Sequence, residues 1–301
     1  FSPGVVAGLV FTLRAFTDPG DKVVIQPPVY PPFARVTRLN DREVVNNPLR
    51  HDGDRYTIDF DDLDRKLCGA RALLLCNPQN PTGRVFDRDE LMRVGELCVR
   101  HGVTIISDDI HADLIQKPYR HIPIASLSPE IAAHTVTLIA PSKTFNIAGL
   151  STSVIITPDD TMRRRLRVEL DKMHADQGNA FGTAALIAAY SHGDQWLDEF
   201  NDYIGGNIEY VCGFLAENLP TVKCHRPEGT YLMWLDFNAW GMPHDELYQW
   251  LIDEAGLGLN DGQRFGEEGV GFMRINLGTS RAVLEQAMQQ LLEAYRRRFG
   301  K

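Results

Sequence analysis

The chain has 301 residues, of which 44% are hydrophobic and 24% are charged, and its formal net charge at pH 7 is −9. This composition is typical of a globular protein, and the negative charge argues against nucleic acid as the main partner. No apolar run approaches the roughly 20 residues that span a bilayer, and no secretory signal is present. The chain has five cysteines: Cys68, Cys76, Cys98, Cys212 and Cys224. Their number is odd and they form no C-x-x-C pair, which predicts a cytoplasmic protein with neither a metal site nor a disulfide framework.

Segments typical of helices and strands alternate through the first two thirds of the chain. Helices are expected over 5–16, from 30–33 onward, over 59–67, and from Asp87 to Gly102, where Asp87 and Glu90 form a capping box. Apolar strands are expected over 22–26, 72–76, 103–107, 135–139 and 152–157. Continuous apolar strands separated by helices predict an α/β fold, in which a mainly parallel sheet is covered by helices on both faces.

The pattern changes after Pro158. Helices are expected over 161–174, 180–191, 195–219, 244–255 and 281–298, and strands over 222–224, over 231–237 and around Arg274. This order predicts a smaller C-terminal α+β domain at 201–301, following a large domain at 1–200. The first residues, Phe1-Ser2-Pro3-Gly4, lack a methionine, and we expect that an N-terminal segment of the folded unit is missing.

Polar residues follow the ends of three buried strands. Asn80 follows the strand over 72–76, Asp108 the strand over 103–107, and Lys143 the strand over 135–139. Such strand ends share one edge of a parallel sheet, where ligands bind. A desolvated lysine that holds an aldehyde, with a carboxylate facing a pyridine nitrogen, is the chemistry of pyridoxal 5'-phosphate. Arg274 lies among apolar neighbours and could grip a substrate carboxylate.

Other residues could complete such a site. His111 could join Asn80 in contacting the phenolic oxygen of the cofactor, and Tyr30, held between Val29 and two prolines, could stack on its ring. The amides of Val5 and Val6 begin a helix and could bind phosphate, with the Ser142 hydroxyl nearby. Each residue also has an ordinary interpretation, such as a packing histidine, a core tyrosine or, for Asn80 and Asp108, a turn residue.

These motifs together resemble the fold-type I pyridoxal-phosphate enzymes of aminotransferase class I/II, and within them the MalY/PatB group of cystathionine β-lyases. The Asn77–Gly83 run and the Asp108-to-Lys143 spacing are typical of the superfamily, whereas Asp-x-x-His at 108–111 points to the lyase branch. The similarity covers essentially the whole chain, with matching segments at Phe1–Val6, Gln26–Phe33, Cys76–Gly83, Ser107–Leu114, Ala140–Leu150, Pro227–Leu232 and Arg274–Gly278.

The resemblance implies β-elimination of cystathionine or a related S-linked amino acid to a thiol, pyruvate and ammonia, with Lys143 as the lysine that holds the cofactor. It also implies a homodimer. An aminotransferase on the same scaffold is the first alternative, and a regulatory binding protein on this fold is the second. Two positions depart from the superfamily pattern: Ala140 stands where many members have a serine, and Ser151 where many have a phosphate-binding arginine.

Overall fold

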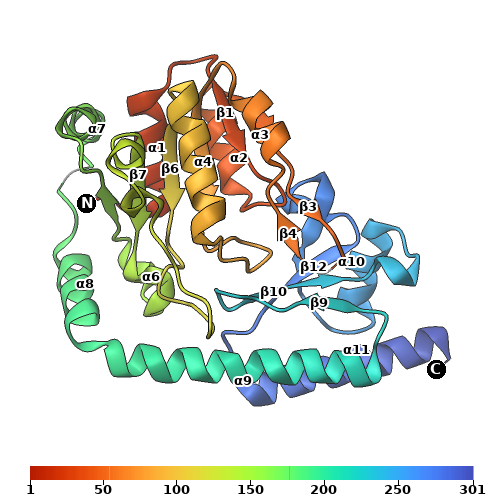
Figure 1. The fold of residues 1–301 in the computed structure, drawn as a ribbon. Helices are drawn as coiled ribbons and strands as arrows, with labels where there is room; N and C mark the ends of the chain where they lie inside the picture. The colour runs from red at the N-terminus through yellow and green to blue at the C-terminus, as the bar shows by residue number, and fades with distance from the viewer. Residues whose placement is uncertain (54, 176, 301) are drawn as a thin grey trace.

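The computed structural model describes residues 1–53, 55–175 and 177–300. Within them, a large unit is built around a mainly parallel sheet and a smaller unit around an antiparallel sheet (Figure 1). Two helices, α9 (Asp194–Asn218) and α11 (Arg281–Phe299), lie against each other along the base of the molecule in that view. The predicted α/β class is confirmed.

In the described part of the chain, the large sheet contains six strands in the order β2–β1–β5–β6–β7–β8. Neighbouring strands are parallel except β7 and β8, which are antiparallel. The edge strand β2 was not predicted, because its burial is partial and it carries no continuous apolar run. The strands are β2 (Glu43–Asn46), β1 (Lys22–Ile25), β5 (Ala70–Cys76), β6 (Thr104–Asp108), β7 (Thr135–Ile139) and β8 (Val154–Ile156).

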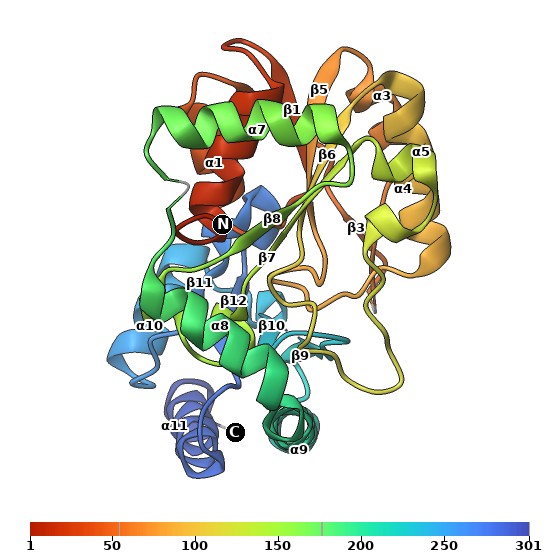
Figure 2. The same cartoon turned by 90° about the vertical axis from the view of Figure 1, so that its left-hand side faces the viewer.

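Helices cover both faces of this sheet (Figure 2). Successive residues of a strand point to opposite faces, and β5 shows the consequence. Leu74 packs with α1 and α2 on one face, and Leu73 packs with α3 and α4 on the other. One face carries α1 (Val5–Phe16), α2 (Pro32–Leu39) and α7 (Asp160–Lys172), and the other carries α3 (Phe60–Leu67), α4 (Arg88–His101) and α5 (Pro129–Ala132).

The ends of α4 follow the local sequence signals. The Asp87 side chain accepts hydrogen bonds from the backbone N–H groups of Asp89 and Glu90, and the Glu90 carboxylate accepts one from the Asp87 N–H, so the capping box is complete. Gly102 ends the helix with φ 64, a left-handed conformation that glycine adopts without steric cost. The predicted limits of this helix are therefore confirmed.

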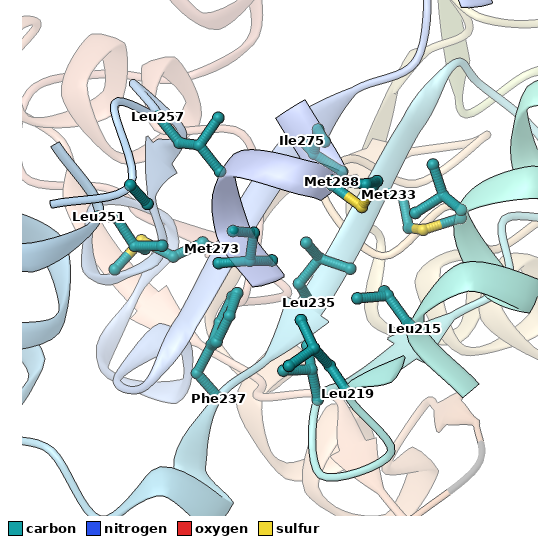
Figure 3. Close-up of a cluster of buried hydrophobic side chains, with 14 of the residues drawn as sticks. Leu215, Leu219, Met233, Leu235, Phe237, Leu251, Leu257, Met273, Ile275 and Met288 are labelled. Carbon is teal, nitrogen blue, oxygen red and sulfur yellow. The ribbon is translucent and has the colours of Figure 1, made fainter. Parts of the chain in front are cut away.

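The smaller unit has its own hydrophobic core (Figure 3). Its sheet has the order β11–β12–β10–β9, and each neighbouring pair is antiparallel. Met233 and Leu235 of β10 point into this core, where α9, α10 and α11 cover them. The remaining elements of this unit are β9 (Lys223–His225), β10 (Leu232–Asp236), α10 (His244–Asp253), β11 (Asn260–Asp261) and β12 (Phe272–Asn276).

The intervening residue Trp234 points the other way and joins the two units. Its indole Nε1 donates a hydrogen bond to the Tyr56 hydroxyl at 3.1 Å, and its ring stacks on Phe272 with centroids 5.3 Å apart. Tyr56 belongs to the hairpin of β3 (Arg50–His51) and β4 (Tyr56–Thr57). The smaller sheet therefore has one face on its own core and one face against the large unit.

The predicted division at residue 200 falls inside α9, which runs without interruption from Asp194 to Asn218. The position of a domain boundary stays a prediction. Between β7 and α9 lie α6 (Pro141–Thr144) and α8 (Ala180–His192). Within residues 1–53, 55–175 and 177–300, no helix has the combination of length and apolar character that crossing a membrane requires.

Candidate active site

A cavity of about 470 Å³ lies at the carboxyl edge of the large sheet, facing β10 and β12 of the smaller unit. The strand ends that were predicted to converge do so, because β5, β6 and β7 are adjacent and parallel. All of the predicted site residues line this one cavity: Val5, Val6, Tyr30, Asn80, Asp108, His111, Ser142, Lys143 and Arg274.

Asp108 and Lys143 stand at the ends of neighbouring strands. Asp108 is the last residue of β6 and pairs with Leu138 of β7, and Lys143 lies on α6, just beyond β7. Burial raises the pKa of Asp108 to about 7, while the Ile110 backbone N–H, 3.2 Å from its Oδ1, and the Lys143 amine act in the opposite direction. A cationic partner in the cavity would therefore stabilise the Asp108 carboxylate.

Arg274 is held in a fixed direction by two amides. Its Nη1 donates to Asn80 Oδ1 and its Nη2 to Asn260 Oδ1, each at 2.7 Å, and its guanidinium lies 4.9 Å from the centre of the Phe265 ring. Among the described residues its buried Nε has no hydrogen-bond partner. Because Asn80 Oδ1 already accepts a hydrogen bond from Arg274, Asn80 can contact a ligand through its side-chain NH₂, which is a hydrogen-bond donor.

Gln79 ties the loop of Asn80 to the segment that carries Tyr30. Its Nε2 donates to the Pro28 carbonyl at 2.6 Å, and its Oε1 accepts from the Thr82 backbone N–H at 2.9 Å. Tyr30 is half-buried, and burial, followed by the charge of Asp108, raises the pKa of its hydroxyl. The tyrosine ring and the asparagine amide therefore keep a fixed relation to each other.

The same loop is fastened to the smaller unit. The Gly83 carbonyl accepts hydrogen bonds from the Glu228 and Gly229 backbone N–H groups at 2.8 and 2.9 Å. The buried Glu228 carboxylate pairs with Arg84 at 3.2 Å and accepts from the Val85 N–H at 2.8 Å. These contacts connect both walls of the cavity, since Glu228 lies shortly before β10.

His111 is buried and electrically neutral near pH 7. Burial, reinforced by the positive charges of Lys143 and Arg274, lowers the pKa of its imidazole to about 3. Its ring meets Tyr231 edge to face at 5.8 Å, and within the described structure its buried Nδ1 has no hydrogen-bond partner. A neutral imidazole in this position can donate one N–H to an oxygen atom in the cavity.

The opposite end of the cavity is suited to an anion. Val5 and Val6 begin α1, and a helix leaves its first backbone N–H groups without intrahelical partners. Gly4 precedes them with φ 107 and offers no capping side chain, so these donors face the cavity without competition from a cap. Ser142, Ser151 and Thr152 line the same region. This end of the cavity therefore supplies backbone amides and hydroxyl groups.

Residues that were not predicted also contribute to this site, and three of them have polar side chains with a clear place in it. Tyr231 and Asn276 line the cavity, and they lie on the neighbouring strands β10 and β12 or directly beside them. Asp113 accepts hydrogen bonds from Thr144 Oγ1 at 2.8 Å and from the Tyr190 hydroxyl at 3.1 Å, and so anchors the turn that carries Lys143. All three residues lie within segments that resemble the family, and this resemblance was the signal that could have identified them.

This set of groups fits pyridoxal 5'-phosphate. The unpaired Nδ1 of His111 and Nε of Arg274 are buried donors or acceptors that need a partner. The uncapped start of α1 suits a phosphate, and the carboxyl of Asp108 suits a protonated pyridine nitrogen. The fold and the cavity together define a pyridoxal-phosphate-dependent enzyme that acts on amino acids.

Comparison with known proteins identifies the family. Residues 1–291 match the aminotransferase class I and II family. The chain is 46% identical over 296 residues to cystathionine beta-lyase PatB of Bacillus subtilis (strain 168), covering 98% of this chain and 76% of PatB. The chain therefore belongs to the aminotransferase class I and II family.

Solved structures agree with this assignment. Cystalysin from Treponema denticola, which contains a pyridoxal 5'-phosphate cofactor, superposes with a TM-score of 0.96 at 35% identity, covering 98% of this chain and 76% of cystalysin. A putative aminotransferase from Clostridium difficile 630 with bound cofactor gives a TM-score of 0.96 at 40% identity, covering 97% and 76%. The chain thus spans about three quarters of the length of each of these relatives.

Proposed function

We propose that this protein is a pyridoxal-phosphate-dependent C–S β-lyase that acts on cystathionine or a related S-linked amino acid. The observation that carries the proposal is that Lys143 and Asp108 line one cavity, close enough for the amine to act on the pKa of the carboxyl. The names of PatB and other relatives supply the reaction class.

The bound cofactor supplies an aldehyde that condenses with amines and a ring that accepts electrons from the neighbouring carbon. Lys143 would hold that aldehyde through its Nζ, and once the substrate amine has displaced it, the freed Nζ would take the proton from the α-carbon of the substrate. The Asp108 carboxylate would keep the proton on the pyridine nitrogen. Asn80 and His111 would donate hydrogen bonds to the phenolic oxygen, and Tyr30 would pack on the ring.

Arg274 binds the α-carboxylate of the substrate, since its planar guanidinium can donate two parallel hydrogen bonds. The amides of Val5 and Val6, together with Ser142, would bind the phosphate. With the α-proton on Lys143, the bond between the β-carbon and sulfur would break, the departing thiolate would take a proton from the Lys143 ammonium, and water would hydrolyse the remaining fragment to pyruvate and ammonia. In this proposal, each predicted site residue that lines the cavity has a role.

The test compares Lys143→Ala with Lys117→Ala, because the Lys117 side chain is 93% exposed and lies outside the cavity. Lys143→Ala should lose both the visible absorbance of the covalently held cofactor and the release of pyruvate from L-cystathionine. Lys117→Ala should retain both. Turnover by Lys143→Ala at the rate of the unmodified protein would contradict the assignment.

The same assay separates the lyase from the aminotransferase alternative. A lyase releases pyruvate from L-cystathionine without any keto-acid acceptor. An aminotransferase instead requires an amino donor together with a keto acid and produces no ammonia. Measuring ammonia and pyruvate with and without an added keto acid therefore decides between the two reactions.

We further propose a homodimer that uses α8. Among the described residues of this helix only Gly182 is buried, although the helix is largely apolar. Phe181 is 80% exposed and Ile187 is 58% exposed, and exposed apolar groups of this kind mark protein interfaces. The helix also lies next to the active-site turn, since Tyr190 contacts Phe145 with ring centroids 5.4 Å apart.

Sedimentation measurements test the dimer. Phe181→Ser and Ile187→Ser should each shift the protein toward the monomer, whereas Val283→Ser, at a residue of α11 that is 52% exposed, should not. An unchanged dimer in all three variants would exclude α8 as the interface.

We also propose a reducing cytoplasmic location, which is supported by the finding that all five cysteines are free thiols.

A further inference from the structure

Two cysteines that are far apart in sequence meet in the smaller unit, away from the active-site cavity. Cys212 lies on α9 and Cys224 on the edge strand β9, where it pairs with Leu235 of β10. Their Sγ atoms are hydrogen-bonded at 3.3 Å, and both residues are half-buried. The other thiols have different surroundings: Cys76 and Cys98 are buried, and Cys68 is exposed.

We propose that Cys212 and Cys224 form a reactive dithiol that a small-molecule disulfide converts to an intrachain disulfide. The proposal goes beyond the lyase function and does not depend on it. A disulfide needs sulfur atoms about 2.05 Å apart, so the two sulfurs need to approach each other by only about 1.3 Å. Helix α9 and strand β9 already hold the two residues side by side.

The surroundings of the pair make Cys224 the attacking group. The hydrogen bond with Cys212 lowers the pKa of the Cys224 thiol against the opposing effect of burial, and the guanidinium of Arg226 acts in the same direction as the hydrogen bond. The same hydrogen bond, together with burial, raises the pKa of Cys212. Since the thiolate is the nucleophile in thiol–disulfide exchange, Cys224 reacts first and Cys212 resolves the mixed disulfide.

The exchange is balanced by its small-molecule partner. The Cys224 thiolate attacks one sulfur of the small disulfide, which forms a mixed disulfide and releases one thiol. The Cys212 sulfur then attacks Cys224 Sγ, which closes the protein disulfide and releases the second thiol. Two electrons pass from the protein to the small molecule, and the two cysteine protons end on the released thiols.

The new bond would join α9 to the edge of the smaller sheet through a loop between residues 212 and 224. A disulfide that closes a loop of this size stabilises a protein mainly by restricting its unfolded chain. The oxidised protein should therefore unfold at a temperature higher by something on the order of 5 °C. A reducing thiol should reverse the shift.

The experiment treats the holoenzyme with glutathione disulfide, blocks the remaining thiols by alkylation, and digests the protein with trypsin without reduction. Trypsin cleaves after Lys223, so the two cysteines fall on separate peptides that remain joined only by a disulfide. We expect the intact protein to lose two hydrogen atoms, and the joined peptide to appear. Dithiothreitol should remove it.

Variants separate this pair from the exposed thiol. The joined peptide should persist in Cys68→Ser and disappear in both Cys212→Ser and Cys224→Ser. Cys212→Ser should instead accumulate glutathione on Cys224, because its resolving thiol is gone. The proposal is overturned if the unmodified protein carries glutathione on Cys68 alone while Cys212 and Cys224 remain fully alkylated.

Discussion

Replacing Asp108 by asparagine in the cofactor-free protein should increase its stability, and by an amount that depends on pH. Asp108 is buried, and burial raises the pKa of its carboxyl from 3.8 to about 7. Asparagine has nearly the same shape, and its Oδ1 can still accept the hydrogen bond from the Ile110 N–H. The substitution therefore removes the ionisation and little else.

The sign follows from proton binding. Between pH 4 and pH 7 the folded protein holds the Asp108 proton more tightly than the unfolded chain, so stability decreases as the pH rises through this interval. Each unit of pKa shift corresponds to about 1.4 kcal/mol. The cost of the buried carboxylate is therefore about 2 kcal/mol at pH 5 and about 4 kcal/mol at pH 8, and it is nearly constant above pH 8.

Urea unfolding of the cofactor-free proteins at pH 5 and pH 8 measures this difference. The gain in unfolding free energy for Asp108→Asn over the unmodified protein should be roughly 2 to 3 kcal/mol larger at pH 8 than at pH 5. Asp202→Asn is the matched control, since the Asp202 side chain is 73% exposed, and it should change stability little at either pH. A gain for Asp108→Asn that is equal at both pH values would refute the reasoning.

Three further predictions concern the walls of the cavity. Arg274→Lys should raise KM for L-cystathionine by about 10- to 100-fold while the cofactor spectrum is retained, because lysine cannot reproduce the two-pronged contact; Arg264→Lys, at a side chain that is 76% exposed, should leave KM unchanged. His111→Gln should preserve the shape of the pH profile of kcat/KM between pH 5 and 8, because the pKa of His111 is already lowered to about 3, and loss of a limb near neutral pH would contradict this. Gly83→Ala should reduce the unfolding free energy by about 3 kcal/mol, since φ is 74 and an added Cβ would lie 2.5 Å from the Pro227 Cβ. Gly102→Ala, with φ 64 and, in the described structure, no atom within 4 Å of an added Cβ, should cost about 1 kcal/mol in the same urea titration, and equal costs would argue against the close contact.

Local signals were sufficient for most of the secondary structure. The helix from Arg88 to His101 could be predicted from its capping box and its terminal glycine because both act within one turn of the residues concerned. The strand Glu43–Asn46 could not, because an edge strand that is only partly buried carries a weak apolar pattern. The direction of Val154–Ile156 also escaped prediction, since it depends on which neighbour the strand meets.

The amino-acid sequence alone was enough to identify the family and to predict Lys143, Asp108 and Arg274 as site residues. Each of them lies in a short motif, and the residues within that motif indicate its chemistry. Other features arise only when distant segments are brought together by folding. Tyr231 contacts His111, Arg274 contacts Asn80, and Cys212 contacts Cys224. The members of each pair are separated in sequence, and hydrophobic periodicity does not predict such contacts. Burial, which sets the pKa of Asp108 and His111, is likewise a property of the packed molecule, since it depends on which atoms exclude water from those side chains.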